Sequence, residues 1–407
     1  MLTLAWRNLW RQRRRSLVTA GAVGTVVTLS ILYYSLGGAS TNSMYQSLTE
    51  GTGQIQVHVT GYRDLREFGT LLIEDAESVR AMIEAGADGA EVIGVLEVPS
   101  LLAGEDRSRG IVLSGQDWTP ALLDRFTNQS LSAGRFLEED ELEGIVLGEA
   151  LANALEVGLG DEVFAYAPGT EGFGAAAYTV VGLLDLLDAN YEGRAAFISL
   201  GAAQELAAPG AVTRFELHYP ELVRLDQDTK IATVRDELRA SLNDYSVESW
   251  QELNPSLVRL LDAIGPMMAA LNIIFFILAG LLVINTIYLS LMERIHEFGI
   301  IISLGANGHK VMGMITLESV LLCVTGAVVG TGAGLAGVAY LSRGFTFPGL
   351  EEYYASFGLN PVFYASITPE QVLFSIAFAL ATGSLAALWP ASMAARLEPV
   401  EAMRFTT

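Results

Sequence analysis

Few side chains in this sequence could perform chemistry. His296-Glu297 begins like the His-Glu-x-x-His helix of zinc proteases, but position 300 is Ile, so the second histidine ligand is missing. The four histidines are scattered, at positions 58, 218, 296 and 309, and Cys323 is the only cysteine. Neither of the two lysines ends a Gly-x-x-x-x-Gly-Lys phosphate loop, and no Gly-x-Ser-x-Gly nucleophile motif occurs. We therefore expect no catalytic residue, metal site or cofactor on this chain.

One acidic residue is unusual because of its apolar surroundings. Glu318 is the only Asp, Glu, Lys or Arg within the four long apolar runs of the chain. An acid at the centre of a bilayer costs about 2.5–3.5 kcal/mol on insertion scales. Because Glu318 lies only about two helical turns from one end of its run, we expect it to make a structural contact near the cytoplasmic face. A role as a proton carrier is the alternative.

The apolar runs predict a membrane protein. Hydrophobic residues make up 51% of the 407 residues and charged residues only 17%. A membrane-spanning helix needs about 20 predominantly apolar residues, and four runs meet this need: 16–39, 263–292, 311–342 and 371–395. The first run follows five arginines and could be a signal peptide or a twin-arginine signal. Its apolar part is longer than the 7–15 residues of a cleaved signal, so we expect an uncleaved anchor.

The distribution of charge predicts the orientation of the chain. Lys and Arg near helix ends mark the cytoplasmic side, and they occur in the N-terminal arm, in 294–310 and in the C-terminal tail. Both termini and 294–310 are thus predicted to be cytoplasmic, with 40–262 outside. Residues 40–262 contain 14 Lys and Arg but 38 Asp and Glu, a net charge of −24 against −22 for the whole chain. We interpret this acidity as a solvated surface, with attraction of a basic partner or substrate as the alternative, and we expect no nucleic-acid partner.

The fold class is therefore a membrane α-helical protein with four transmembrane helices and a large extracytoplasmic α+β domain between helices 1 and 2. We divide the chain into 1–39 (basic arm and first helix), 40–262 (outer domain) and 263–407 (helices 2–4, with a cytoplasmic loop at 293–310). Periodicity predicts strands at 54–60, 110–114, 144–148, 162–166, 177–184, 195–200 and 214–219. It predicts helices at 76–84, 149–155, 202–206 and 229–242.

The loop between the second and third spans is predicted to form a short amphipathic helix. Its apolar side would contain Ile295, Phe298, Ile301 and Ile302, and Leu304-Gly305 would end it. Such a helix can lie in the membrane surface or dock into a groove on a cytoplasmic partner. Docking is favoured because surface-lying helices are rich in Lys and Arg, which this one is not.

Three further features concern the membrane helices. Gly326, Gly330 and Gly334 lie four residues apart and predict a face for close helix packing, although glycine is also simply tolerated in membrane helices. Pro390 is predicted to bend or end the fourth helix. Apolar residues from Leu257 onward recur at helical spacing, so the second helix is predicted to begin as a stalk outside the bilayer.

Three separate stretches resemble one known family. The pattern Arg-x-x-Glu-[Ile/Phe]-Gly-Ile-x-x-x-Leu-Gly-Ala is matched by Arg294, Glu297, Phe298, Gly299, Ile300, Leu304, Gly305 and Ala306. The basic start at 6–15 and the end at 390–404, with its Ala-Arg-x-x-Pro, are similar too. These stretches resemble the FtsX-like permease family, whose members include MacB-type exporters and the LolC and LolE lipoprotein-releasing subunits. The resemblance extends over the whole chain, including 144–152 and 160–163.

The resemblance implies a mode of action called mechanotransmission. The residues of the loop motif would form a coupling helix seated on a separate ABC ATPase, which would bind ATP and Mg. Arg294 would be a polar clamp there. Two permease chains, identical or different, would pair in the inner membrane and move their outer domains. One departure from the family is Ile302, where Arg or Lys is common, so the contact with the ATPase would differ.

Several functions agree with this resemblance. Extraction of lipoproteins or lipids ranks first, with a lipoprotein substrate or a periplasmic chaperone or adaptor as a further partner. MacB-like export and FtsX-like regulation of a cell-wall hydrolase follow. Residues 167–174 occupy the place where lipoprotein releasers carry a protruding hairpin, although a plain exposed turn is favoured. A membrane receptor with a ligand-sensing outer domain is the alternative from a different class.

Overall fold

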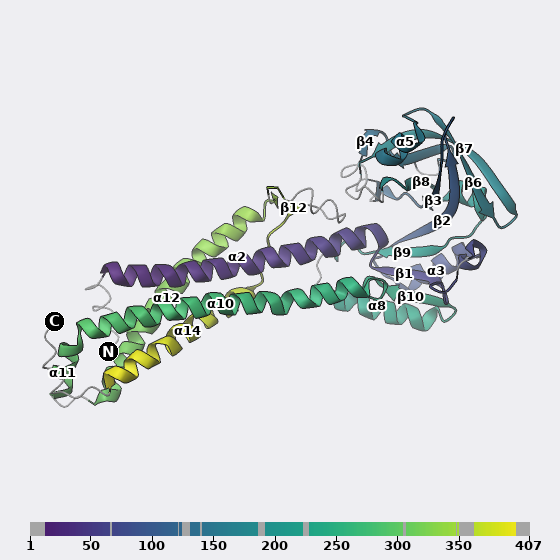
Figure 1. The fold of residues 1–407 in the computed structure, drawn as a ribbon. Coiled ribbons are helices and arrows are strands. Elements are labelled where there is room, and N and C mark those ends of the chain that lie inside the picture. The colour runs from purple at the N-terminus through teal and green to yellow at the C-terminus, as the bar shows by residue number, and fades with distance from the viewer. Residues whose placement is uncertain are drawn as a thin grey trace. The chain divides into compact units, whose positions relative to one another are not determined.

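The computed structural model describes residues 13–65, 67–120, 122–123, 131–138, 141–185, 192–222, 228–303, 307–346, 348–349 and 362–395. These residues form two compact units, whose elements are labelled in Figure 1. The helical unit contains the described residues up to Ser40, Arg259–Phe345 and those from Val362 onward. The sheet unit contains the described residues of Thr41–Val258 and of Thr346–Pro361.

Long apolar helices make up the helical unit. They are α2 (Arg13–Thr52), α10 (Pro255–Glu293), α12 (Gly308–Leu341) and α14 (Pro369–Ala395). All four are long and apolar enough to cross a membrane, which confirms the predicted spans. With 39 residues, α10 is about 58 Å long, nearly twice the hydrocarbon core of about 30 Å. It begins eight residues before its apolar run, as the predicted stalk requires.

The fourth helix does not end at its proline. Although Pro390 was predicted to bend or end the helix, α14 continues through it to Ala395. Proline removes only one backbone hydrogen bond, and neighbouring helices in a membrane bundle can compensate for that loss. The connection before α14 contains a two-stranded sheet, β11 (Phe345–Thr346) with β12 (Val362–Phe363).

One ten-stranded sheet dominates the described part of the sheet unit. Its strands are β1 (Ile55–Val59), β2 (Glu91–Ala103), β3 (Ser108–Gln116), β4 (Leu131–Gly134), β5 (Gly144–Gly148), β6 (Glu162–Gly169), β7 (Gly172–Leu184), β8 (Ala195–Ser199), β9 (Arg214–His218) and β10 (Tyr245–Ser249). Their hydrogen-bonded order is β10-β1-β9-β2-β3-β8-β5-β7-β4, and β6 pairs with both β2 and β7. The strands β2, β3, β8, β5, β7 and β6 therefore close into a ring, from which β9, β1 and β10 extend.

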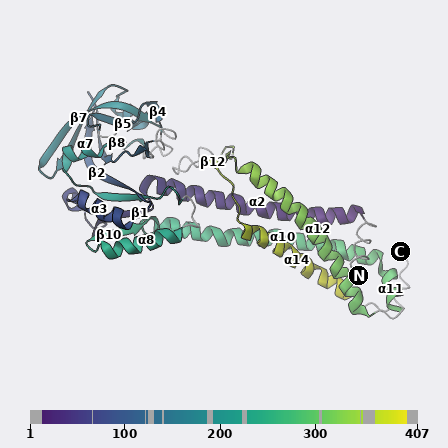
Figure 2. The ribbon, with the colours of Figure 1, turned by 180° about the vertical axis from the view of Figure 1, so that it is seen from behind.

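Each part of the sheet has its own apolar core. The ring encloses a cluster that includes Leu96, Leu113 and Val163, and α7 (Leu200–Ala207) packs against its strands. Figure 2 shows α7 beside β7 and β8. The extension buries a second cluster against α3 (Ala76–Gly86) and α8 (Asp228–Ser241). Two shorter helices, α5 (Glu149–Leu155) and α9 (Trp250–Leu253), follow β5 and β10.

Every strand and helix predicted in the outer domain overlaps an observed element, but several elements were missed. The most important is β2, which pairs with β3, β6 and β9. Its first half is buried on both faces and does not alternate, which hides a strand from periodicity. An exposed turn lies within 167–174 as expected, but it is shorter than that range: β6 ends at Gly169 and β7 begins at Gly172, so only Thr170 and Glu171 turn.

Candidate coupling site

The amphipathic loop segment forms α11, Ile295–Ser303, directly after α10 and Arg294. The Phe298 amide donates a hydrogen bond of 3.1 Å to the carbonyl of Arg294, so the helix starts without a gap. Phe298 is only 1% exposed, whereas Ile300 is 42% exposed. The short helix therefore has one side packed into the helical unit and one side open.

This burial changes which residues can contact a partner. Phe298 and Gly299 are buried within the chain itself, so they attach α11 to the helical unit instead of forming the expected docking surface. Ile300 is exposed and Glu297 is partly exposed. These two remain candidates for a contact. Leu304, Gly305 and Ala306 lie outside the described residues.

Arg294 connects α11 to a neighbouring membrane helix. Its guanidinium lies 3.2 Å from the Glu297 carboxylate and 3.3 Å from the Glu318 carboxylate of α12. It also lies over the Phe298 ring, 5.1 Å from the ring centre. Only 15% of the Arg294 side chain and 17% of the Glu318 side chain are exposed. A charge in a membrane helix needs such a partner, so Arg294 makes Glu318 a structural contact between α10, α11 and α12.

A small cavity of about 40 Å³ lies beside this ion pair. Its polar walls are formed by hydroxyl and charged side chains, namely Ser16, Thr286, Ser290, Arg294, Glu318 and Ser319. A polar cavity of this size has room for one or two water molecules. The ion pair is therefore not held in a purely hydrocarbon environment.

The small-residue face of α12 packs against α2. A Cβ added at Gly326 would lie 2.6 Å from the carbonyl oxygen of Ala20, and one added at Gly330 would overlap the backbone of Gly24. At Gly334 the added atom would lie 2.9 Å from the Ile31 side chain. These separations leave no room for a methyl group, so the two backbones approach closely along this face.

Polar side chains tie the four long helices together. Ser30 of α2, Asn272 of α10 and Ser375 of α14 are almost completely buried. The Asn272 side-chain amide donates to the Ser30 hydroxyl at 2.9 Å, and the Ser30 and Ser375 hydroxyl oxygens are 2.9 Å apart. The Thr28 hydroxyl also donates to the carbonyl of Gly330 at 2.9 Å. These contacts link α2 to all three other long helices.

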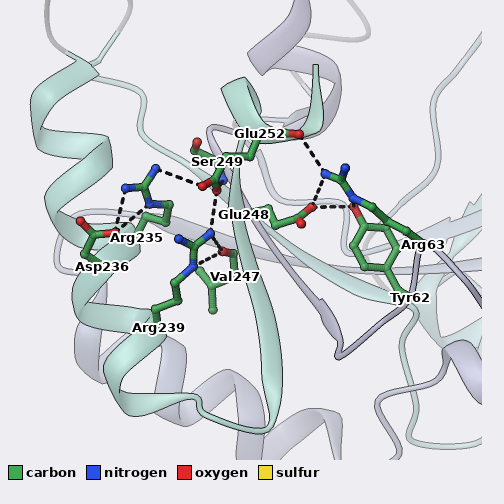
Figure 3. A network of polar contacts seen from close by, with 9 residues as sticks. All are labelled: Tyr62, Arg63, Arg235, Asp236, Arg239, Val247, Glu248, Ser249 and Glu252. Carbon is green, nitrogen blue, oxygen red and sulfur yellow. Dashed lines mark hydrogen bonds and ion pairs between the residues drawn. The ribbon is translucent and has the colours of Figure 1, made fainter. Parts of the chain in front are cut away.

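In the sheet unit, a second polar network surrounds the start of α9, just before α10 (Figure 3). The Glu252 carboxylate lies 2.7 Å from Arg239 and 3.5 Å from Arg235, both on α8. It also accepts the Ser249 amide at 3.1 Å, as part of a capping box. From the turn after β1, Arg63 donates to the carbonyl of Glu252 and to the Glu248 carboxylate, each at 2.8 Å.

This network fixes α9 in the sheet unit. An aromatic contact adds to it: the Trp250 ring lies edge-on to the Tyr45 ring of α2, with centres 5.3 Å apart. The Trp250 amide also donates to the carbonyl of Gln54 at 3.0 Å. The C-terminal part of α2 and the segment that enters α10 are therefore both fastened to the same sheet. The Ser-x-x-Glu pattern at 249–252 is the sequence signal that could have predicted this cap.

A buried polar cluster lies on β1 and β9. Although burial opposes ionisation, the Arg214 guanidinium, 2.7 Å from Glu216, lowers the pKa of that carboxyl group. Burial lowers the pKa of His58 to about 3, and the nearby charge of Arg214 acts in the same direction. His58 stacks on Tyr62 with ring centres 3.9 Å apart. Among the described residues, no group of three or more His, Cys, Asp or Glu could hold a metal ion.

Comparison with known proteins gives two family matches. The model of the MacB-like periplasmic core domain matches residues 16–241, more than half of the chain. The model of the FtsX-like permease C-terminal region matches residues 269–399.

Individual relatives are more distant. The uncharacterized ABC transporter permease YknZ of Bacillus subtilis is 27% identical over 40% of this chain and 37% of its own length. The macrolide export ATP-binding/permease protein MacB of Vibrio parahaemolyticus is 27% identical over 44% of this chain and 26% of its own length. MacB of Wolinella succinogenes is 24% identical over 99% of this chain and 60% of its own length. The chain thus spans less than two thirds of the length of each of these relatives.

Solved structures show a weaker likeness. The periplasmic region of MacB from Actinobacillus actinomycetemcomitans is 15% identical, with a TM-score of 0.35 and coverage of 51% of this chain and 95% of that one. The extracellular domain of YknZ from Gram-positive bacteria is 14% identical, with a TM-score of 0.34 and coverage of 48% of this chain and 99% of that one.

Proposed function

This chain belongs to the FtsX-like permeases with a MacB-like periplasmic core domain, and from that premise we propose that it transmits motion rather than conducting a substrate. A separate ABC ATPase, carrying ATP and Mg, would press on the exposed side of α11. Arg294 would pass the displacement to α12 through Glu318, and α2 and α10 would carry it to the sheet unit. The observation that supports this proposal most is the anchoring of α11 by Arg294 to Glu318 and Phe298.

The proposed orientation places α11 and both termini in the cytoplasm and the sheet unit outside. The positive-inside rule supports it through the basic residues at the cytoplasmic ends. Aromatic residues support the position of the bilayer, since Tyr340 and Tyr364 are exposed towards one end of the bundle and Trp389 towards the other. Residues 364 and 389 are 25 positions apart, most of them in α14, and that helix is about 40 Å long, enough to span a hydrocarbon core of about 30 Å.

Two substrate classes remain as proposals. Extraction of lipoproteins or lipids agrees with work done outside the membrane, since the cavity of about 40 Å³ beside Arg294 is far too small for an acyl chain or a drug. Export of a small molecule is favoured by a different observation: a protein named for macrolide export matches 99% of this chain. In either case a second permease chain would complete the membrane part.

Co-purification with the ATPase tests the proposal. Ile300→Asp places a charge on the exposed side of α11 and should abolish stoichiometric recovery of an ABC ATPase and its substrate-stimulated hydrolysis. His309→Asp is the matched control, because His309 is exposed at the start of α12, outside α11. It should retain both. Equal recovery of the ATPase with both variants would contradict the assigned role of α11.

Labelling tests the orientation separately. In a Cys323→Ser background, Ile300→Cys and Glu171→Cys introduce single thiols in α11 and in the turn between β6 and β7. A membrane-impermeant maleimide applied to whole cells should label only the second. Labelling of both positions would place α11 on the same side as the sheet unit and refute the mechanism.

A further inference from the structure

A groove crosses the outer surface of the ring in the sheet unit. Strands of a small closed ring alternate between a filled interior and a solvated exterior, and the interior here is already packed. The groove has a volume of about 500 Å³, within the range of about 300–1,000 Å³ that is usual for small-molecule sites. Phe173 is 76% exposed there and Val112 is 51% exposed, although the core of the ring does not need these side chains. The apolar residues of the lining include Pro99, Leu101, Val112, Tyr166, Pro168 and Phe173.

The pairing of the strands makes this apolar surface continuous. Val112 of β3 lies opposite Pro99 of β2. Leu101, also of β2, lies opposite Tyr166 of β6. Phe173 belongs to β7, which pairs with β6 in turn. Because residues opposite each other on neighbouring strands have side chains within contact range, the apolar lining is unbroken from β3 to β7.

The groove is long enough for one extended acyl chain. Its lining residues come from β7, β6, β2 and β3 and, beyond β3, from Arg194, which directly precedes β8. These five strands are successive neighbours in the ring and lie about 4.8 Å apart, so the groove extends over about 19 Å. Carbon–carbon single bonds of about 1.5 Å at an angle of about 111° advance about 1.25 Å per bond, and an acyl chain of about 16 carbons covers the same distance.

The charges at the groove differ between its two ends. Of the described residues in its lining, Arg194 alone is charged, and it lies at the β8 end. Glu171 is exposed in the turn at the other end, beside Phe173. The charged residues of the turn between β2 and β3, at 105–109, do not belong to the lining. An amphiphile with an anionic head would therefore bind in one direction, with its head at Arg194 and the end of its tail at Phe173.

The chemistry of arginine determines which head group fits. A guanidinium presents a planar fork of N–H donors that matches a carboxylate, and such charge-assisted pairs are stronger than neutral hydrogen bonds. A cationic head would be repelled by Arg194. Glu171 has little effect on the head group, because salt screens interactions between exposed charges beyond about 8–10 Å.

We propose that this groove binds a long-chain fatty acid, with the carboxylate on Arg194 and the end of the acyl chain on Phe173. Burial of the acyl chain supplies the affinity, and Arg194 selects the head group. The site deepens the proposed function and rests on it for its role, since it names the substrate class that the sheet unit would hold while the ATPase moves it. Binding itself requires no ATPase.

Photolabelling of the purified full chain in nanodiscs, without an ATPase, tests the site. The probe is palmitic acid with a diazirine at the end of its acyl chain, and mass spectrometry should find adducts in peptides from 162–184, which contain β6 and β7. Adducts in the four long helices report the amount of probe in the bilayer and serve as the internal standard. A hexadecyl-trimethylammonium and a two-chain phospholipid with the same diazirine should label 162–184 at least tenfold less. Equal labelling by either, or no adduct in these strands, would overturn the proposal.

Substitutions of exposed side chains then test the assigned contacts. Arg194→Gln should lower the adduct yield in 162–184 at least fivefold, and Arg194→Lys should restore most of it. Arg109→Gln, on β3 but outside the lining, is the matched control and should leave the yield unchanged. Tyr166→Ser with Phe173→Ser should lower the yield severalfold. Thermal unfolding should not change in any of these variants. A yield insensitive to Arg194→Gln would refute the site, whereas Ile300→Asp should leave the yield unchanged, so a failure of the coupling through α11 is distinguished from a failure of this site.

Discussion

Replacement of Arg294 by alanine should loosen α11 without unfolding the bundle. The guanidinium makes three contacts that differ in strength. Its i,i+3 pair with Glu297 is worth about 0.2–0.5 kcal/mol, and its position over the Phe298 ring about 0.5–1 kcal/mol. The pair with Glu318 contributes most, because both side chains are largely buried.

The magnitude for the Glu318 pair follows from its surroundings. Severing a fully buried ion pair costs about 3–5 kcal/mol, since one charge is left without a partner. The polar cavity beside Glu318 reduces this cost, because water can solvate the abandoned carboxylate. We expect Arg294→Ala to weaken the attachment of α11 by about 2 kcal/mol, a factor of about 30 in its opening equilibrium.

Hydrogen exchange of the complete protein in nanodiscs measures this equilibrium. Amides of 295–303 should exchange about 30-fold faster in Arg294→Ala, while those of α12 should change little. His296→Ala, an exposed change on the same helix, is the control and should have no effect. In a double-mutant cycle, Glu318→Gln should remove most of the effect of Arg294→Ala. Additive effects of the two substitutions, or unchanged exchange in Arg294→Ala, would refute the bridge between α11 and α12.

Three further predictions concern the two units. Gly330→Ala should destabilise the bundle by about 2 kcal/mol, since the methyl group overlaps α2. Thermal unfolding in detergent should show this loss. The control Gly332→Ala should show none, because its methyl group would lie in open space. Glu252→Gln should lower the free energy of unfolding, measured with denaturant, by about 1 kcal/mol; the loss is small because the side chain is partly exposed. The exposed control Asp236→Asn should change this free energy little. Because the pKa of His58 is about 3 in the fold but about 6.5 when unfolded, the unfolded chain binds the proton first. As the pH falls from 6.5 to 4.5, the free energy of unfolding should fall by up to about 1.4 kcal/mol per pH unit. His58→Asn should flatten that slope. An unchanged slope in this variant would contradict the burial of a neutral imidazole.

The sequence predicted the membrane helices well because a single physical requirement determines them. A segment that crosses a bilayer must be apolar over its whole length and must satisfy its own backbone, and both properties are local. The glycine face of α12 could also be predicted, because a spacing of four residues is visible in the sequence. The helix that packs against this face could not be predicted, because any of the other helices could have packed there. Only the structure places Gly24 of α2 against Gly330.

Contacts between distant residues could not be predicted from hydrophobic periodicity either, because periodicity is a local property of the sequence. Glu318 could be expected to need a partner, but Arg294 lies 24 positions away and was assigned to a different contact. The network around Glu252 joins Arg63 to Glu248 across 185 positions. Burial of Phe298 was also missed, because an amphipathic pattern shows which side of a helix is apolar but not whether that side packs against the same chain or against a partner.

The ties within the helical unit determine how a displacement of α11 can spread. Arg294 attaches α11 to α12, close glycine packing attaches α12 to α2, and Ser30 attaches α2 to α10 and α14. The hydrogen bonds at Ser30 are buried, so sliding α2 past α10 or α14 would break bonds that no water replaces. Under the proposed mechanism, a push on α11 would be resisted by the whole bundle and would move it as one body. Under the proposed mechanism, the work delivered by the ATPase would appear as a tilt or shift of α2 and α10, and no substrate path through the bundle is required.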